Sequence, residues 1–164
     1  MIKKIFLLTL FIIFIAIGCQ KASSNAIKIR IGPEPQTIDP TLNTSIDGAT
    51  YIVHTFEGLT TKDKDNKIVA GVAESWDISE DGLTYTFYIR DNAKWSDGQK
   101  VKAEDFVYSW QRAVDPIVAS GYSYQLEPIL NAKEITEGKM DKSNLGVKAL
   151  DERTLEVKLK SPTA

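Results

Sequence analysis

Residues 73–112 read AESWDISEDGLTYTFYIRDNAKWSDGQKVKAEDFVYSWQR, and this stretch decides the fold. From Leu83 to Ile89, large apolar side chains occupy every second position, a period of two that predicts a half-buried strand. Asp-Gly pairs at 81–82 and 97–98 predict tight turns on both sides of this strand, because glycine adopts positive φ angles without strain. The pattern is that of a structural frame, and it contains no catalytic arrangement.

An amphipathic helix is predicted after the second turn, ending near Arg112. Asp115-Pro116 marks its limit, because the residue before a proline avoids the helical region. Four side chains at helical spacing form its apolar face: Phe106, Val107, Trp110 and Val114. We expect three tryptophans to pack this frame: Trp76, Trp95 and Trp110.

Residues 1–18 have the pattern of an export signal. Lys3 and Lys4 precede an uncharged apolar run at 5–17, which is shorter than the roughly 20 residues that a bilayer span needs. The run ends in small residues directly before Cys19, the only cysteine, and this junction resembles the lipobox of bacterial lipoproteins. That resemblance implies lipidation of the Cys19 thiol and a membrane anchor; the alternative is an ordinary cleaved signal, or a buried N-terminal anchor, with a chance cysteine. Residues 19–26 are polar and small, which predicts a flexible tether.

Charge and histidine content exclude several classes of function. The chain has 20 basic and 22 acidic residues, and loss of Lys3 and Lys4 with the signal leaves 18 against 22, a net charge of −4. Without a basic cluster, no nucleic-acid partner is expected. His54 is the only histidine, and no Ser-His-Asp order around it is credible. A metal site needs several ligands and His54 has no histidine partner, so we expect it on the surface or at a rim. We therefore expect no enzyme and no cofactor.

The remaining chain reads as short helices and strands. A helix after a cap at Ser45 or Asp47 is supported by an apolar face and stopped by Gly58. That face comprises Ala49, Ile52, Val53 and Phe56. Further expected elements are a strand at 27–31, a hairpin turn at 62–67, a loop at 119–126, a short helix at 129–135 and a strand hairpin at 147–159.

Four motifs in order carry a resemblance to a known family. They are AESW at 73–76, YIRDNAKWSDG at 88–98, AEDFVYSWQRAVDP at 103–116 and LGVKALDERTLEVKL at 145–159. This combination resembles the family 5 extracellular solute-binding proteins of ABC importers, most closely their oligopeptide-binding lipoproteins and periplasmic proteins. The resemblance covers almost everything from Ile27 to Pro162, and it identifies the chain as an N-terminal fragment of such a protein.

The resemblance implies a mixed α/β (α+β) architecture, the N-terminal part of a two-lobed fold with a small β-rich inserted domain and the second lobe missing. It divides the chain into a signal at 1–18, a tether at 19–26, the start of the core domain at 27–59 and the inserted domain at 60–164. It also implies capture of oligopeptides on the periplasmic or outer side of a membrane, delivery to permease subunits, and a monomeric protein.

The resemblance also implies where the ligand is contacted. Asn43, Thr44, Ser45 and Ile46 match a loop whose backbone faces the ligand, and Tyr122, after Ser120-Gly121, matches a tyrosine near the ligand. Two alternatives stay open: a surface lipoprotein that binds host or matrix proteins, or a family member that carries a dipeptide, nickel, haem or a sugar.

A chain with one lobe buries only part of a peptide and cannot close over it. We therefore expect residues 20–164 alone to bind peptides very weakly or not at all. Titration calorimetry with a peptide mixture measures this, and tight binding would contradict the expectation.

Overall fold

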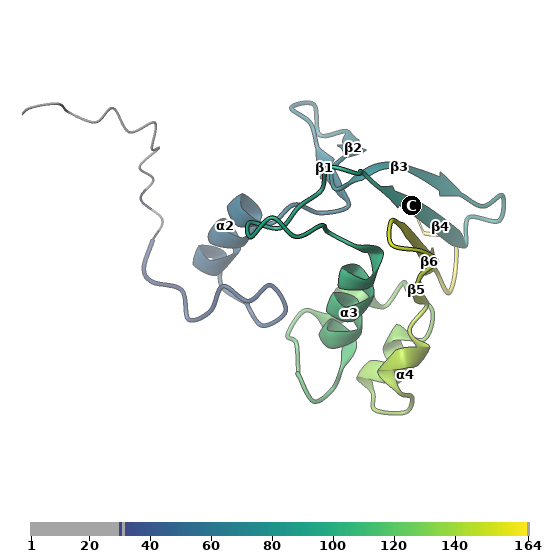
Figure 1. Ribbon diagram of the computed structural model, residues 1–164. Coiled ribbons are helices and arrows are strands. Elements are labelled where there is room, and N and C mark those ends of the chain that lie inside the picture. Colours follow the sequence, from purple (N-terminus) through teal and green to yellow (C-terminus); the bar gives the residue numbers. More distant parts are fainter. Residues whose placement is uncertain (1–29, 31, 164) are drawn as a thin grey trace, which may run out of the picture. The chain divides into compact units, whose positions relative to one another are not determined.

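The computed structural model describes residue 30 and residues 32–163, and its centre is a four-stranded antiparallel sheet (Figure 1). The strand order is β3-β4-β6-β5, so the alternating stretch predicted from the sequence, β4, is a central strand. Phe87 in β4 pairs with Trp76 in β3 on one side and with Leu155 in β6 on the other. The strands are β3 (Ala73–Ile78), β4 (Thr84–Ile89), β5 (Val147–Ala149) and β6 (Thr154–Lys158).

The two Asp-Gly turns and the charged hairpin are confirmed. Gly82 and Gly98 have φ angles of 68° and 90°, in the left-handed region that glycine enters at no steric cost. Residues 62–67 connect β1 (Thr60–Lys62) to β2 (Ile68–Ala70), which form a separate two-stranded sheet. The strand hairpin at 147–159 is confirmed as β5 and β6.

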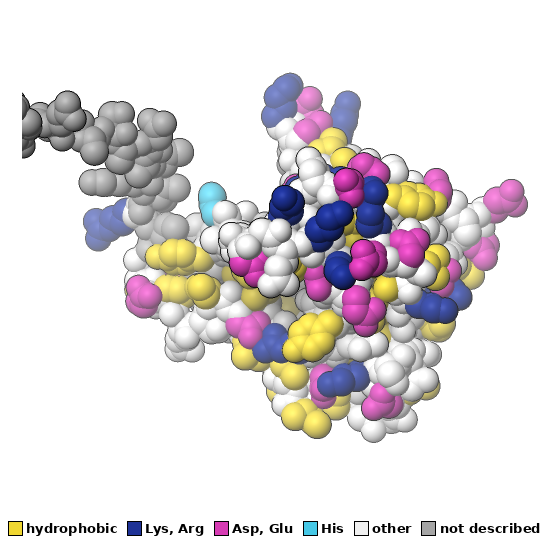
Figure 2. Space-filling model, in the orientation of Figure 1, with side chains coloured by type: hydrophobic (Ala, Val, Ile, Leu, Met, Phe, Trp, Pro, Cys, Tyr) yellow, Lys and Arg dark blue, Asp and Glu magenta, His cyan; other side chains and the backbone are white. Residues whose placement is uncertain are grey.

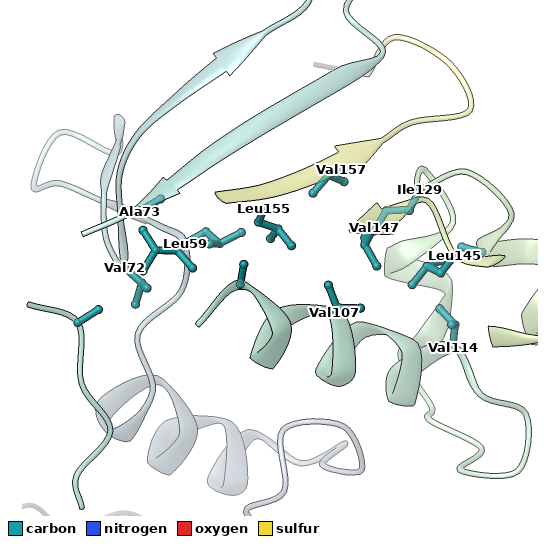
Figure 3. Packing of buried hydrophobic residues seen from close by; sticks show 14 of the residues in the cluster. Leu59, Val72, Ala73, Val107, Val114, Ile129, Leu145, Val147, Leu155 and Val157 are labelled. Carbon is teal, nitrogen blue, oxygen red and sulfur yellow. The ribbon is translucent and has the colours of Figure 1, made fainter. Parts of the chain in front are cut away.

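Helix α3 (Ala103–Val114) packs against the face of the sheet formed by β5 and β6 (Figure 3). Its predicted apolar face is confirmed: Val107 and Val114 are buried, and Phe106 and Trp110 are partly buried against the same core. The largest fully buried side chains of this core are Ile89, Val114, Ile135 and Leu155. Burying a side chain of this size contributes about 1.5–3 kcal/mol, so this core stabilises the packing of helix on sheet.

The short elements differ from expectation in their limits. Residues 119–126, expected as a loop, contain the 3₁₀ helix η2 (Ser123–Leu126). The short helix expected at 129–135 is α4 (Ala132–Thr136), because Ile129 instead forms a bridge to Leu159, directly after β6. A second 3₁₀ helix, η3 (Lys142–Asn144), follows before β5.

Helix α2 (Ile46–Thr55) is present, but its expected apolar face is not buried. Val53 is 70% exposed and Phe56 is 47% exposed, and Gly48 is the only buried residue of the helix. Hydrophobic side chains are accordingly visible over α2 in Figure 2. The apolar spacing predicted the helix correctly and its burial wrongly, because no described element packs along that face. The helix also ends before Gly58, with Phe56 as its C-terminal cap in an extended conformation.

Two of the three tryptophans pack the frame as expected. Trp76 lies against Phe87 with ring centroids 6.3 Å apart, and Trp110 packs on the core. Trp95 is 43% exposed, which contradicts the prediction. Its indole Nε1 donates a hydrogen bond to Asp105 Oδ2 at 3.0 Å, so a polar partner holds it at the surface.

The predictions of a signal, of lipidation at Cys19 and of a tether lie outside the described residues. The strand expected at 27–31 also lies outside them, apart from Arg30.

A matched pair of isoleucines tests where the stability resides. Ile89→Ala removes a fully buried side chain from β4 and should lower the free energy of unfolding by about 2–5 kcal/mol. Ile117→Ala changes a side chain that is 91% exposed and should stay within about 0.5 kcal/mol. Urea unfolding followed by far-UV circular dichroism measures both. Equal losses in the two variants would contradict this account of the core.

Candidate functional site

The first candidate ligand segment is a turn built by Asp39. The Asp39 carboxylate accepts the backbone N–H of Thr41 at 2.9 Å, and the Asp39 carbonyl accepts the N–H of Asn43 at 2.9 Å. The Asp39 carbonyl also accepts the N–H of Leu42 at 3.1 Å, so the main chain and the side chain of Asp39 close the turn together. The turn leads to Asn43, the first residue of the predicted ligand loop.

Asn43 orders the rest of that loop from a buried position. It is only 7% exposed, its amide donates to the Ser45 carbonyl at 2.9 Å, and its Oδ1 accepts from the Ser45 hydroxyl at 3.0 Å. Ser45 Oγ in turn accepts the N–H of Gly48 at 3.0 Å, which makes Ser45 the N-terminal cap of α2, as predicted. Thr44 is exposed and Ile46 is 86% exposed, so the loop presents these two residues to solvent.

The second candidate segment, which carries Tyr122, begins at the end of α3. Asp115 directly follows the helix, and its carboxylate accepts the N–H of Ile117 at 3.0 Å and the ammonium of Lys142 at 2.6 Å. Tyr122 is 44% exposed, and its ring lies 5.9 Å from that of Tyr124 at an angle of 56°. The phenol of Tyr122 is therefore open to solvent beside a second aromatic ring.

The structure brings the two segments into contact, although they are far apart in the sequence. The Ser120 hydroxyl donates to the Thr41 carbonyl at 2.6 Å. Gly121 approaches so closely that a Cβ atom there would lie 2.9 Å from Thr44 Cγ2. Thr44 thus touches the residue that precedes Tyr122. Glycine at 121 is needed for this close approach.

An ion pair that sequence reasoning missed joins the same two parts of the chain. The guanidinium of Arg112 donates to both carboxylate oxygens of Asp39, at 2.9 and 2.6 Å, and each side chain is 31% exposed. The hydrogen bond from Arg112 lowers the pKa of Asp39 below its ordinary value of 3.8, and the Asp39 carboxylate raises the pKa of Arg112. No local pattern could have found this pair, because 73 residues separate the partners.

A groove of about 760 Å³ lies between the end of α2 and the face of α3 that carries Trp110. Apolar and aromatic side chains line much of it, among them Phe56, Trp95 and Phe106. Glu57 and Arg90 close one side through a bidentate ion pair at 2.8 and 3.0 Å. The exposed side chain of Trp95 thus forms part of the wall of this groove.

Neither a metal centre nor a membrane-crossing helix is found in the part of the chain that the structure describes. Within residues 30 and 32–163, no three His, Cys, Asp or Glu side chains gather as metal ligands. In the same residues no helix is both long and apolar enough to cross a bilayer. His54 is exposed, as predicted, and its Nδ1 donates to the Thr50 carbonyl at 2.7 Å.

The model of the family "Bacterial extracellular solute-binding proteins, family 5 Middle" matches residues 67–164. The chain is 44% identical over 147 residues to the periplasmic oligopeptide-binding protein OppA of Escherichia coli, covering 88% of this chain and 27% of that protein. It is 46% identical over 132 residues to the probable deoxycholate-binding periplasmic protein YgiS of Escherichia coli, covering 79% and 24%.

A solved structure, Listeria monocytogenes OppA bound to peptide, superposes with a TM-score of 0.76 at 44% identity, over 78% of this chain and 25% of that one. The mixed α/β fold expected from the sequence is therefore confirmed as part of a periplasmic binding protein fold. The chain spans about a quarter of the length of these relatives.

The pair of Asp115 and Lys142 generates a titration prediction. The Lys142 ammonium lowers the pKa of Asp115 below 3.8, so stabilisation by this pair is present above that value and is lost as the pH falls through the lowered pKa. Lys142→Gln should raise the pKa of Asp115, measured by NMR titration of its carboxyl carbon. Lys139→Gln, which removes the partner of Glu137 instead, is the matched control. An unchanged Asp115 pKa in Lys142→Gln would refute the assignment.

Proposed function

Because this chain belongs to the family 5 bacterial extracellular solute-binding proteins, we propose that it is the N-terminal part of an importer component that captures oligopeptides. In this role the protein binds a peptide on the outer side of the cytoplasmic membrane and delivers it to the permease subunits of an ABC importer. The family is one of substrate-binding proteins, so the task assigned to the chain is binding and not catalysis.

One observation carries the proposal: the two segments expected to contact ligand touch each other. Thr44 lies against Gly121, and the neighbouring side chains of Ile46 and Tyr122 are open to solvent. A tyrosine offers a flat apolar face and a hydroxyl, which suits contact with peptide main chain and with varied side chains. The backbone of Asn43–Ile46 can pair with an extended peptide irrespective of its sequence, as in strand addition. Such recognition suits a transporter of many peptides.

We also propose roles for the N-terminal residues and a division of the chain into domains. Residues 1–18 act as a lipoprotein signal, Cys19 carries the lipid anchor and 19–26 form the tether. Residues 27–59 begin the core domain and 60–164 form the small inserted domain. The protein works as a monomer held at the outer face of the membrane.

A second candidate is a different solute. The relative named as deoxycholate-binding is as similar to this chain as the oligopeptide-binding one, and the groove beside α2 is lined by aromatic side chains. An amphipathic molecule such as a bile acid is therefore the alternative ligand to a peptide. Mass spectrometry of molecules that co-purify with the protein distinguishes the two classes.

A chimaera with a full-length relative tests the function. Residues 32–163 replace the corresponding part of Escherichia coli OppA, and we expect this protein to bind peptides. Tyr122→Ala should weaken binding on the order of tenfold, because tyrosines at the centre of an interface contribute strongly. Titration calorimetry with a peptide library gives the affinities.

Tyr124→Ala is the matched control, since Tyr124 lies with its ring tilted beside that of Tyr122, is 58% exposed and is not among the predicted ligand residues. Its affinity should stay within about twofold of the unsubstituted chimaera. A chimaera that folds and binds deoxycholate but no peptide would favour the second candidate. Equal losses at both tyrosines would argue against the assigned contact.

A further inference from the structure

Helix α2 is held to the rest of the described chain mainly near its two ends. Before it, Asp39 pairs with Arg112 of α3; after it, Glu57 pairs with Arg90, which follows β4. Between these points Val53 and Ile46 face solvent, and only Gly48 is buried. The position of the loop that precedes α2 therefore cannot come from burial of the helix. It must come from the polar contacts at residues 39–45.

Those contacts form a continuous series from α3 to the first turn of α2. Arg112 binds both oxygens of Asp39, and the Asp39 carbonyl accepts the N–H of Asn43. Asn43 then binds Ser45 through both its amide nitrogen and its oxygen, and Ser45 caps Gly48. Each link is a direct hydrogen bond of 3.1 Å or less. Arg112 is the only member of this series that belongs to a helix packed in the core.

The same helix positions the segment that carries Tyr122. Asp115 at the end of α3 accepts the backbone N–H groups of Val118 and Ala119 through its carbonyl, at 3.0 and 3.3 Å. Ser120 then donates to Thr41, which closes the path between the two segments. Arg112 and Asp115 are one helical turn apart, so a single rigid element fixes both candidate ligand contacts.

We propose that Asp39 and Arg112 are positioning residues: their bidentate ion pair holds the ligand loop of Asn43–Ile46 in a fixed position relative to Tyr122. The role of the loop in ligand binding rests on the proposed function, whereas the claim that the ion pair holds the loop in place does not. The geometry favours it over a simple surface ion pair. Two parallel N–H to O bonds fix direction as well as distance, and the Asp39 side chain also closes the turn to Thr41.

Hydrogen–deuterium exchange of the full chain tests the structural claim. Asp39→Asn keeps the shape of the side chain and the oxygen that accepts from Thr41 but removes the charge. The amides of residues 42–49 should then exchange on the order of threefold faster or more, because local opening no longer has to break the ion pair. The amides of β4 should exchange at the rate of the unsubstituted chain.

Glu57→Gln is the matched control. It makes the same chemical change in the other Arg–carboxylate pair, whose arginine is also 31% exposed, and it should leave residues 42–49 unaffected. Arg112→Lys retains the charge without the two-point geometry and should give an intermediate rate. Unchanged exchange at 42–49 in Asp39→Asn, or an equal rise in β4, would overturn the proposal.

The role in binding is tested in the chimaera with OppA. Asp39→Asn should weaken peptide binding several-fold, on the order of the change in loop exchange, and Glu57→Gln should not. Faster loop exchange with unaltered affinity would overturn the positioning role. A chimaera without substitution that binds no peptide would overturn the proposed function, whereas the exchange rates would still decide whether the ion pair holds the loop.

Discussion

The burial of α3 against β5 and β6 is the interaction on which the rest of the described structure depends. Val107 and Val114 enter the core from the helix, and Leu155 and Val157 enter it from the sheet. Because a well-packed interior resists displacement, the last turn of α3 becomes a fixed platform. Arg112 and Asp115 project from that platform, and each organises a loop that has no core of its own. The apolar packing of α3 thus fixes the positions of the polar residues that organise the two candidate ligand segments.

The part of the fold that the sequence predicted is the part determined by local pattern. The alternation from Leu83 to Ile89, the two Asp-Gly turns and the face of Val107 and Val114 each depend on residues close in the chain, and each is confirmed. Periodicity reports which side of an element is apolar. It does not report whether a partner exists to cover that side.

Helix α2 shows this limit. Its apolar residues have helical spacing like those of α3, yet Val53 and Phe56 are exposed. Trp95 shows a second limit. Its aromatic ring was expected to pack inside, but its indole N–H is bound by Asp105 at the surface. Of the candidate site, sequence resemblance supplied Asn43–Ile46 and Tyr122. The contact between them, and the ion pair from Asp39 to Arg112, arise only when distant segments meet.

The outer strand β3 has a consequence for the behaviour of the protein in solution. Its pairing with β4 is interrupted between Ala73 and Ser75, and its exposed positions include the acidic residues Glu74 and Asp77. An irregular edge with negative charge is a poor template for another strand, so uncontrolled growth of the sheet from copy to copy is disfavoured.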